Sequence, residues 1–358
     1  MRALRLYAGP VARTRIAERG LTPDMVRVIP AAAGGPKGLI LGPLDRFLFG
    51  EWLVHSQQPV DLVGASIGAW RMATACLDHS VAAFERLEHD YIHQHYELPP
   101  GQKRPTADQV SREFGQNLAL FYGGRIPEVL HHARYRLHVV TARGRHLLRR
   151  EHRLATPLGY LGAYVSNAVH RRALGAWLER VVFSTASELP FASNDYRTRR
   201  VALSAANFQS ALQASCSIPF VLRSVRDIPG APPGAYWDGG LTDYHLHLDY
   251  RQRCGSDGIV LYPHFQRRVV PGWLDKAFKW RHGATHALDH ALVLAPDPAW
   301  VRQLPNAKLP DRTDFTRYGS DLAARVAAWS TATAAARQLA DEFADWLRRP
   351  DPTRLEAL

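Results

Sequence analysis

One segment, residues 59–80, constrains the fold of this chain more than any other. The apolar run Val60–Val63 follows a proline and predicts a short buried strand. Gly64-Ala65-Ser66-Ile67-Gly68 comes next, and residues 69–77 then favour a helix. A G-x-S-x-G sequence between a strand and a helix is typical of a nucleophile elbow, in which the serine lies at the tip of a strained turn. The flanking glycines let strand and helix pass closely, and the helix N-terminus favours a developing negative charge.

A second loop of small residues follows another predicted strand. Residues 26–29 alternate in polarity, and the chain then runs through Ala33-Gly34-Gly35-Pro36-Lys37-Gly38 into an apolar segment, residues 39–54, predicted to be helical. Backbone N–H groups of such a loop can point at an anion, either a nucleotide phosphate or the oxyanion of acyl transfer. Neither G-x-x-x-x-G-K-[ST] nor G-x-G-x-x-G occurs, so the spacing disfavours a nucleotide.

The order of the remaining predicted elements indicates an α/β protein with a mostly parallel sheet and helices on both faces. Ligands of such sheets bind at the carboxyl ends of the strands, where both loops above are expected. The Pro- and Gly-rich residues 98–105 predict a loop near the mouth of that site. Further predicted helices cover residues 81–96, 106–121, 160–178 and 205–215, and further strands residues 135–141, 180–185 and 258–262.

Length and composition place the chain in a broad class. Its 358 residues, 46% of them hydrophobic, suit one large α/β domain with an extension. The absence of a long apolar run, of a signal-like N-terminus and of any C-x-x-C sequence among the three cysteines leads us to expect a cytoplasmic protein. The net charge of +12 is compatible with nucleic acid, an anionic membrane or acidic substrates, or with arginines merely spread over the surface.

Three motifs, in this order, resemble those of the patatin-like phospholipases. Gly34-Gly35-Pro36-Lys37-Gly38 resembles that family's G-G-G-x-[RK]-G loop, and Gly64-Ala65-Ser66-Ile67-Gly68 resembles its G-x-S-x-G. Asp238-Gly239-Gly240 is similar to its D-G-[GA] motif, and residues 212–219 are similar to the Ala-Ser-x-x-x-Pro stretch before it. The resemblance covers about residues 25–245, and it departs at Ala33, where the family has its first loop glycine.

The resemblance implies a three-layer α/β/α fold and a serine–aspartate dyad without a catalytic histidine. Ser66 would be the nucleophile and Asp238 its partner, with the amides of Gly34 and Gly35 holding the oxyanion. Gly64 and Gly68 would shape the elbow. No metal or cofactor is implied.

Lys37 is the candidate for contact with a substrate phosphate, the alternative being a solvated loop lysine. The implied activity is hydrolysis of carboxylic esters in phospholipids, lysophospholipids or related acyl esters. Acyl transfer to an acceptor other than water is an alternative in the same chemistry. A non-catalytic lipid- or partner-binding module, motivated by Ala33, is an alternative of another class. Nucleic acid is not expected as a partner, and the sequence does not indicate an oligomeric state.

The last third of the chain lies outside the motifs. We expect residues 1–265 to form the patatin-like domain and residues 266–358 a mainly helical extension packed on it, including one long helix over residues 321–348. Residues 273–281 combine aromatic and basic side chains. A helix there would lie on an anionic membrane or, the interpretation we favour, pack on the core.

Just after the D-G-G motif, four polar residues alternate along the chain: Asp243, His245, His247 and Asp249. A strand would place them on one face. We favour a solvated strand face over a metal patch or a substrate contact.

Overall fold

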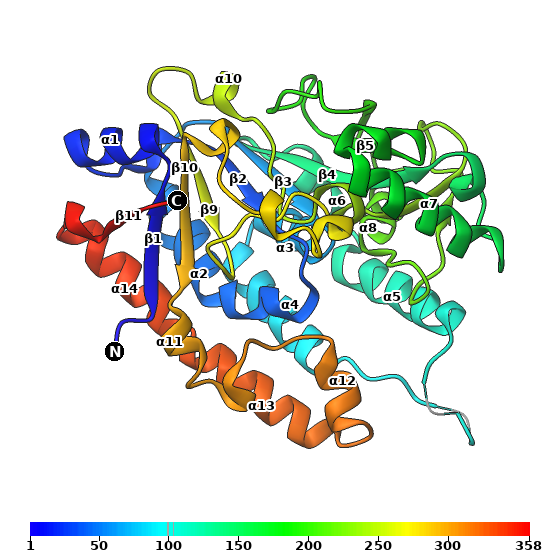
Figure 1. The fold of residues 1–358 in the computed structure, drawn as a ribbon. Helices are drawn as coiled ribbons and strands as arrows, with labels where there is room; N and C mark the ends of the chain where they lie inside the picture. Colours follow the sequence, from blue (N-terminus) through cyan, green and yellow to red (C-terminus); the bar gives the residue numbers. More distant parts are fainter. Residues whose placement is uncertain (99, 103) are drawn as a thin grey trace.

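A single 11-stranded sheet forms the centre of the molecule (Figure 1). The computed structural model describes residues 1–98, 100–102 and 104–358, so Pro99 and Lys103 of the predicted loop 98–105 lie outside the described residues. Nine strands follow the order β11-β1-β10-β9-β2-β3-β4-β5-β6, β8 pairs with β4, and β7 pairs with β8. The strands are β1 (Leu4–Ala8), β2 (Val26–Ala31), β3 (Val60–Ala65), β4 (Tyr135–Gly144), β5 (Leu178–Ser184), β6 (Thr198–Ala202), β7 (Val225–Arg226), β8 (Ala235–Asp238), β9 (Ile259–Pro263), β10 (Ala291–Pro296) and β11 (Leu355–Ala357).

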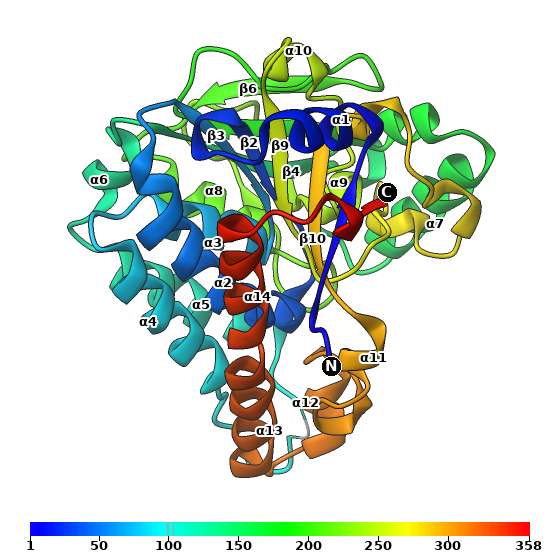
Figure 2. The ribbon, with the colours of Figure 1, turned by 90° about the vertical axis from the view of Figure 1, so that its left-hand side faces the viewer.

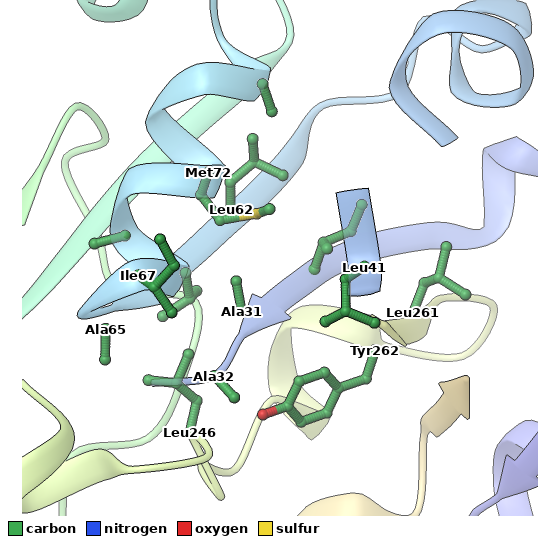
Figure 3. Packing of buried hydrophobic residues seen from close by; sticks show 14 of the residues in the cluster. Ala31, Ala32, Leu41, Leu62, Ala65, Ile67, Met72, Leu246, Leu261 and Tyr262 are labelled. Atoms are coloured by element: carbon green, nitrogen blue, oxygen red, sulfur yellow. The ribbon is translucent and has the colours of Figure 1, made fainter. Parts of the chain in front are cut away.

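The middle of the sheet is parallel, as predicted. The parallel run β10-β9-β2-β3-β4 is followed by antiparallel pairing of β4 with both β5 and β8. Every residue of β3 is buried, because the strand lies between β2 and β4 and packs against α3, which explains why its sequence is a nearly continuous apolar run. Figure 3 shows Leu62 and Ala65 of β3, Ala31 of β2 and Ile67 of the following helix within one apolar cluster.

Helices form a layer on each side of the sheet, consistent with a three-layer α/β/α arrangement. Helices α2, α3, α4 and α14 gather on one side of the strands, and α7 and α9 lie on the other (Figure 2). The helices are α1 (Pro10–Arg19), α2 (Gly42–Phe47), α3 (Ile67–Ala75), α4 (Ser80–Ile92), α5 (Ala107–Tyr122), α6 (Ile126–Leu130), α7 (Ala155–Val169), α8 (Phe208–Cys216), α9 (Gly240–Asp243), α10 (Arg251–Cys254), α11 (Pro298–Val301), α12 (Thr313–Tyr318), α13 (Leu322–Ala335) and α14 (Arg337–Arg348).

The last third of the chain belongs to the same sheet. β10 pairs with β9 and β1, and β11 adds a parallel edge strand beside β1. The boundary expected at residue 265 therefore falls within one continuous sheet. The long helix predicted over residues 321–348 is interrupted at Ala336, which separates α13 from α14.

Two other predicted segments differ from the structure. Residues 39–54 form a succession of 3₁₀, α and π turns that includes α2, instead of one helix. Residues 273–281 form two 3₁₀ turns, in which Leu274 and Phe278 are buried while Trp273 and Trp280 are exposed. Local periodicity does not reveal such breaks, since the apolar side chains still face the core on average.

The predicted polar strand over residues 242–249 is wrong. Asp243 ends helix α9, and the left-handed backbone of Leu246 (φ 47°) interrupts any extended run. His245 is buried, and Asp249 pairs with Arg251 at 2.8 Å, so the four polar side chains do not share a solvated face.

Asp243 belongs instead to a buried ionic network. The guanidinium of the fully buried Arg180 donates two hydrogen bonds to Asp243, at 2.7 and 2.6 Å. It donates two more to the carboxylate of Asp195, at 2.9 and 2.8 Å. This arginine thus ties the end of α9 to strand β5 and to the loop before β6.

Candidate active site

Ser66 occupies a strained turn between β3 and α3. Its backbone has φ 57° and ψ −130°, a conformation that costs a non-glycine residue about 1–3 kcal/mol. Gly68 makes the turn possible, because a Cβ there would lie 1.9 Å from the carbonyl oxygen of Ala31. The elbow is therefore pressed directly against the end of β2, where the glycine loop begins.

The Ser66 hydroxyl donates a 2.7 Å hydrogen bond to Oδ2 of Asp238, across 172 positions of sequence. Both side chains are buried, with exposed fractions of 4% and 6%. The pairing follows from the sheet, since β4 pairs with β3 on one side and with β8, which ends at Asp238, on the other. The N–H of Gly240 donates to the second carboxylate oxygen at 2.7 Å and orients the group.

Burial raises the pKa of Asp238 above its ordinary value. The hydrogen bond from Ser66 and the positive charge of Arg312 oppose this rise in pKa without cancelling it. A carboxylate with a raised pKa is a better proton acceptor for a serine hydroxyl than an ordinary aspartate.

Among the described residues, no histidine side chain is hydrogen-bonded to Ser66 or Asp238. The buried His245 is nearby in sequence, but its Nδ1 accepts from the Val270 N–H at 3.0 Å. Burial holds the pKa of His245 well below its usual value. The serine and aspartate thus meet directly, without an imidazole between them.

Ser215, near the end of α8, is hydrogen-bonded to the Ser66 turn. The Ser66 N–H donates to the Ser215 hydroxyl at 3.0 Å, and that hydroxyl donates to the Val140 carbonyl at 2.7 Å. The Gly239 N–H donates to the Ser215 carbonyl at 3.2 Å, so one residue contacts both halves of the site. Sequence reasoning assigned Ser215 no role, although it lies in the Ala-Ser-x-x-x-Pro stretch.

The glycine loop contacts the elbow and the Asp238 turn. The Ala33 N–H donates to the Tyr244 carbonyl at 2.8 Å and is therefore occupied. Within the described part of the chain, the N–H groups of Gly34 and Gly35 donate to no acceptor. A Cβ on Gly240 would lie 2.8 Å from the Ala33 methyl, which places the loop beside the aspartate turn. Two unpaired amides thus lie in the loop next to the serine–aspartate pair.

Three cationic side chains from separate segments surround this site. Lys37 lies with its Nζ 5.3 Å from the Phe265 ring, and burial lowers its pKa. Lys276 lies with its Nζ 4.0 Å from the Tyr244 ring. Arg312, just before α12, lies beside the Gly34-Gly35 loop, since a Cβ on Gly35 would be 3.2 Å from the Nε of Arg312.

The charges of Lys37 and Arg312 act on Lys276. Burial, followed by the positive charges of Lys37 and Arg312, lowers the pKa of Lys276 to about 8. Across the described residues, no carboxylate lies within salt-bridge distance of any of the three. Sequence reasoning found Lys37 alone, because Lys276 and Arg312 carry no motif. The arrangement provides a buried nucleophile with a base, two free amides and excess positive charge at its rim.

Across the part of the chain that the structure describes, no group of three or more His, Cys, Asp or Glu side chains is arranged to hold a metal ion. No helix in the same residues is both long and apolar enough to cross a membrane. No protein-family model matches this chain, and no match to it is found among curated proteins.

Proposed function

We propose that this chain is a patatin-like serine hydrolase that cleaves carboxylic esters of phospholipids, lysophospholipids or related acyl esters. The observation that carries the proposal is the 2.7 Å hydrogen bond from the Ser66 hydroxyl to Asp238 in a strained elbow. The strained backbone of Ser66 and the buried carboxylate of Asp238 both lower the stability of the fold, so their presence favours a functional role for this pair.

In the proposed reaction, Asp238 accepts the Ser66 proton as Oγ attacks the ester carbonyl. The free N–H groups of Gly34 and Gly35 then stabilise the oxyanion of the tetrahedral intermediate, each worth about 3–4 kcal/mol if lost. The proton passes from Asp238 to the leaving alcohol, which leaves an acyl-enzyme. Water then attacks the acyl carbon as Asp238 takes its proton, and that proton passes to Ser66 Oγ as the acyl–Oγ bond breaks and the fatty acid leaves.

We further propose that the acyl ester carries an anionic group. Lys37, the sequence candidate for a phosphate contact, would share that group with Lys276 and Arg312. Among the described residues, none of the three has a carboxylate within salt-bridge distance, and the charges of Lys37 and Arg312 repel that of Lys276. An anionic headgroup would relieve that repulsion. The proposal places the activity in the cytoplasm, against an anionic membrane that supplies the substrate.

One observation favours a second candidate, a non-catalytic lipid-binding module. The Ala33 N–H, at the family's first loop glycine, is already bonded to Tyr244, so fewer amides remain for an oxyanion. Fatty-acid release from short-chain esters and from phospholipid vesicles, with a chelator present, separates the two candidates.

Wild type is compared with Ser66→Ala and Asp238→Asn in that assay, and each protein is incubated with a fluorophosphonate probe. Loss of release in both variants supports the dyad. Wild type that is inactive on the whole panel and unlabelled by the probe favours the binding module. Formation of a new ester from an added alcohol or lysophospholipid acceptor, in place of free fatty acid, identifies acyl transfer instead of hydrolysis.

A further inference from the structure

Helix α7 has its apolar face turned outward. Leu158, Leu161 and Val165 have exposed fractions of 60%, 58% and 55% and follow one another at helical spacing. Leu154, just before the helix, and Val169, its last residue, extend the same stripe and are also exposed. The opposite, buried face consists of small, polar and aromatic residues: Thr156, Gly159, Tyr160, Ala163 and Asn167. A surface helix normally buries its aliphatic stripe, so this orientation indicates a binding surface for another apolar surface.

Exposed aromatic side chains continue this face. The Tyr160 ring packs against Phe220, whose exposed fraction is 66%. Tyr164 of α7 stacks on Phe278, and Phe278 in turn contacts Trp280, which is 73% exposed. We call the exposed members of this set the α7 face: Leu154, Leu158, Leu161, Tyr164, Val165, Val169, Phe220 and Trp280.

The α7 face adjoins the candidate active site. Tyr160 packs from the buried side of α7 against Trp237, with ring centroids 5.9 Å apart, and Trp237 directly precedes Asp238. The negative charge of Asp238 contributes, after burial, to raising the pKa of Tyr160, as expected for close neighbours. A hydrophobic layer covering this face would therefore lie against the helix whose Tyr160 contacts Trp237, the residue before Asp238.

The flanks of α7 are strongly basic. Residues 143–173 contain seven arginines and one acidic residue, Glu151. Glu151 is held by Arg223 and by the N–H of Ser224, so its charge is already balanced. Arg149, Arg150 and Arg153, before the helix, are exposed, and no described carboxylate pairs with them. Figure 1 shows α7 at the edge of the molecule, away from α1 and α14.

We propose that the α7 face docks on an anionic lipid surface, with the aliphatic and aromatic side chains entering the interface and the arginines contacting headgroups. An apolar stripe flanked by bases and interfacial aromatics is the composition expected of a peripheral membrane contact. A second copy of the chain would bring the same unbalanced arginines against this face, which disfavours a dimer. This inference rests on the proposed function, since a bilayer bound at the α7 face would be the source of the acyl ester that Ser66 attacks.

Binding is measured by sedimentation with vesicles of phosphatidylcholine alone or mixed with phosphatidylglycerol. All proteins carry Ser66→Ala, so the readout does not depend on hydrolysis. The double variant Leu158→Asn/Val165→Asn is compared with Leu120→Asn, a matched control on α5 whose side chain is 72% exposed. We expect binding to the mixed vesicles to weaken by more than about tenfold in the double variant and to stay unchanged in the control.

A second variant, Arg149→Gln/Arg150→Gln/Arg153→Gln, isolates the charge. Its affinity for the anionic vesicles is expected to fall by about fivefold or more per arginine near the surface, and 1 M salt should abolish the difference from the parent protein. Thermal melts of every variant test for folding.

Equal binding of the parent and the Leu158→Asn/Val165→Asn protein would overturn the inference. So would a dimer in solution that this double variant dissociates without any change in vesicle binding. Vesicle binding in a chain that proves catalytically inert would overturn the proposed function and leave the docking face standing.

Discussion

Substitution of Ser215 by alanine tests how the elbow is held. Ser215 is fully buried, and its hydroxyl connects the Ser66 N–H to the Val140 carbonyl. The change removes one oxygen atom and leaves the helix propensity of α8 no worse, since alanine is the strongest helix former. Any effect must therefore come from the two lost hydrogen bonds.

The magnitude follows from burial. An N–H deprived of its partner in the interior costs about 1–3 kcal/mol, and the Ser66 N–H has no other acceptor among the described residues. The strain of the elbow backbone is of the same size, about 1–3 kcal/mol. We therefore expect the free energy of unfolding to fall by about 2 kcal/mol, and the Ser66 turn to relax away from its attacking geometry.

Two assays measure these effects. Urea unfolding gives the loss of stability, and the rate of fluorophosphonate labelling of Ser66 should fall by about 10- to 100-fold, since 1.4 kcal/mol is one factor of ten. Ser217→Ala is the matched control, because the Ser217 hydroxyl is also buried but, among the described residues, donates only to the Gln213 carbonyl one turn earlier. Ser215→Ala protein with the stability and labelling rate of the Ser217→Ala control would refute the reasoning.

Three further predictions concern other parts of the structure. Gly68→Ala should lower the rate of ester hydrolysis at least about 100-fold, because the added methyl would lie 1.9 Å from the Ala31 carbonyl oxygen and force the Ser66 turn away from the Gly34-Gly35 loop. A folded variant with the wild-type rate would contradict this. The acidic limb of the kcat/KM–pH profile should lie above the ordinary aspartate pKa of about 4, because protonated Asp238 cannot accept a proton. Arg312→Gln should move this limb to higher pH, because it removes a positive charge that lowers the pKa of Asp238. A shift of the limb to lower pH would exclude Asp238 as the base. Arg180→Met should destabilise the fold by about 3–5 kcal/mol in urea unfolding, because it removes the cation that is bonded to the buried Asp243 carboxylate. A loss below about 1 kcal/mol would mean that the network is dispensable.

The sequence by itself determined the local parts of this protein. The apolar run of β3, the G-x-S-x-G turn and the start of α3 were all predictable, because strand burial, turn sterics and helix propensity act over a few residues. The α/β class followed from the alternation of such segments. The family pattern also allowed Ser66, Asp238 and the Gly34-Gly35 loop to be named together, and the structure places them beside one another.

Other predictions failed where distant contacts override local pattern. The residues after Asp238 alternate like a strand, yet Asp243 turns inward because the buried guanidinium of Arg180, 63 positions earlier, binds it with two hydrogen bonds. Strands β10 and β11 were not predicted. The three-residue β11 is too short to carry a local signal and joins the sheet by pairing with β1, whereas β10 is a buried apolar run that was predictable on the same grounds as β3.

Only the tertiary structure decided which side chains surround the dyad and which face the outside. Lys276 and Arg312 carry no motif, and the motif-like stretch around Ser215 does not show which groups its hydroxyl contacts. All three reach the site because α8 and two irregular segments pack around it. The aliphatic stripe of α7 has the periodicity of a core helix, and it is exposed because the small residues and Tyr160 on its other face fit against β8 and its neighbours. Periodicity establishes that a helix has an apolar side, whereas the choice of the side that faces the core depends on the shape of the surface it meets.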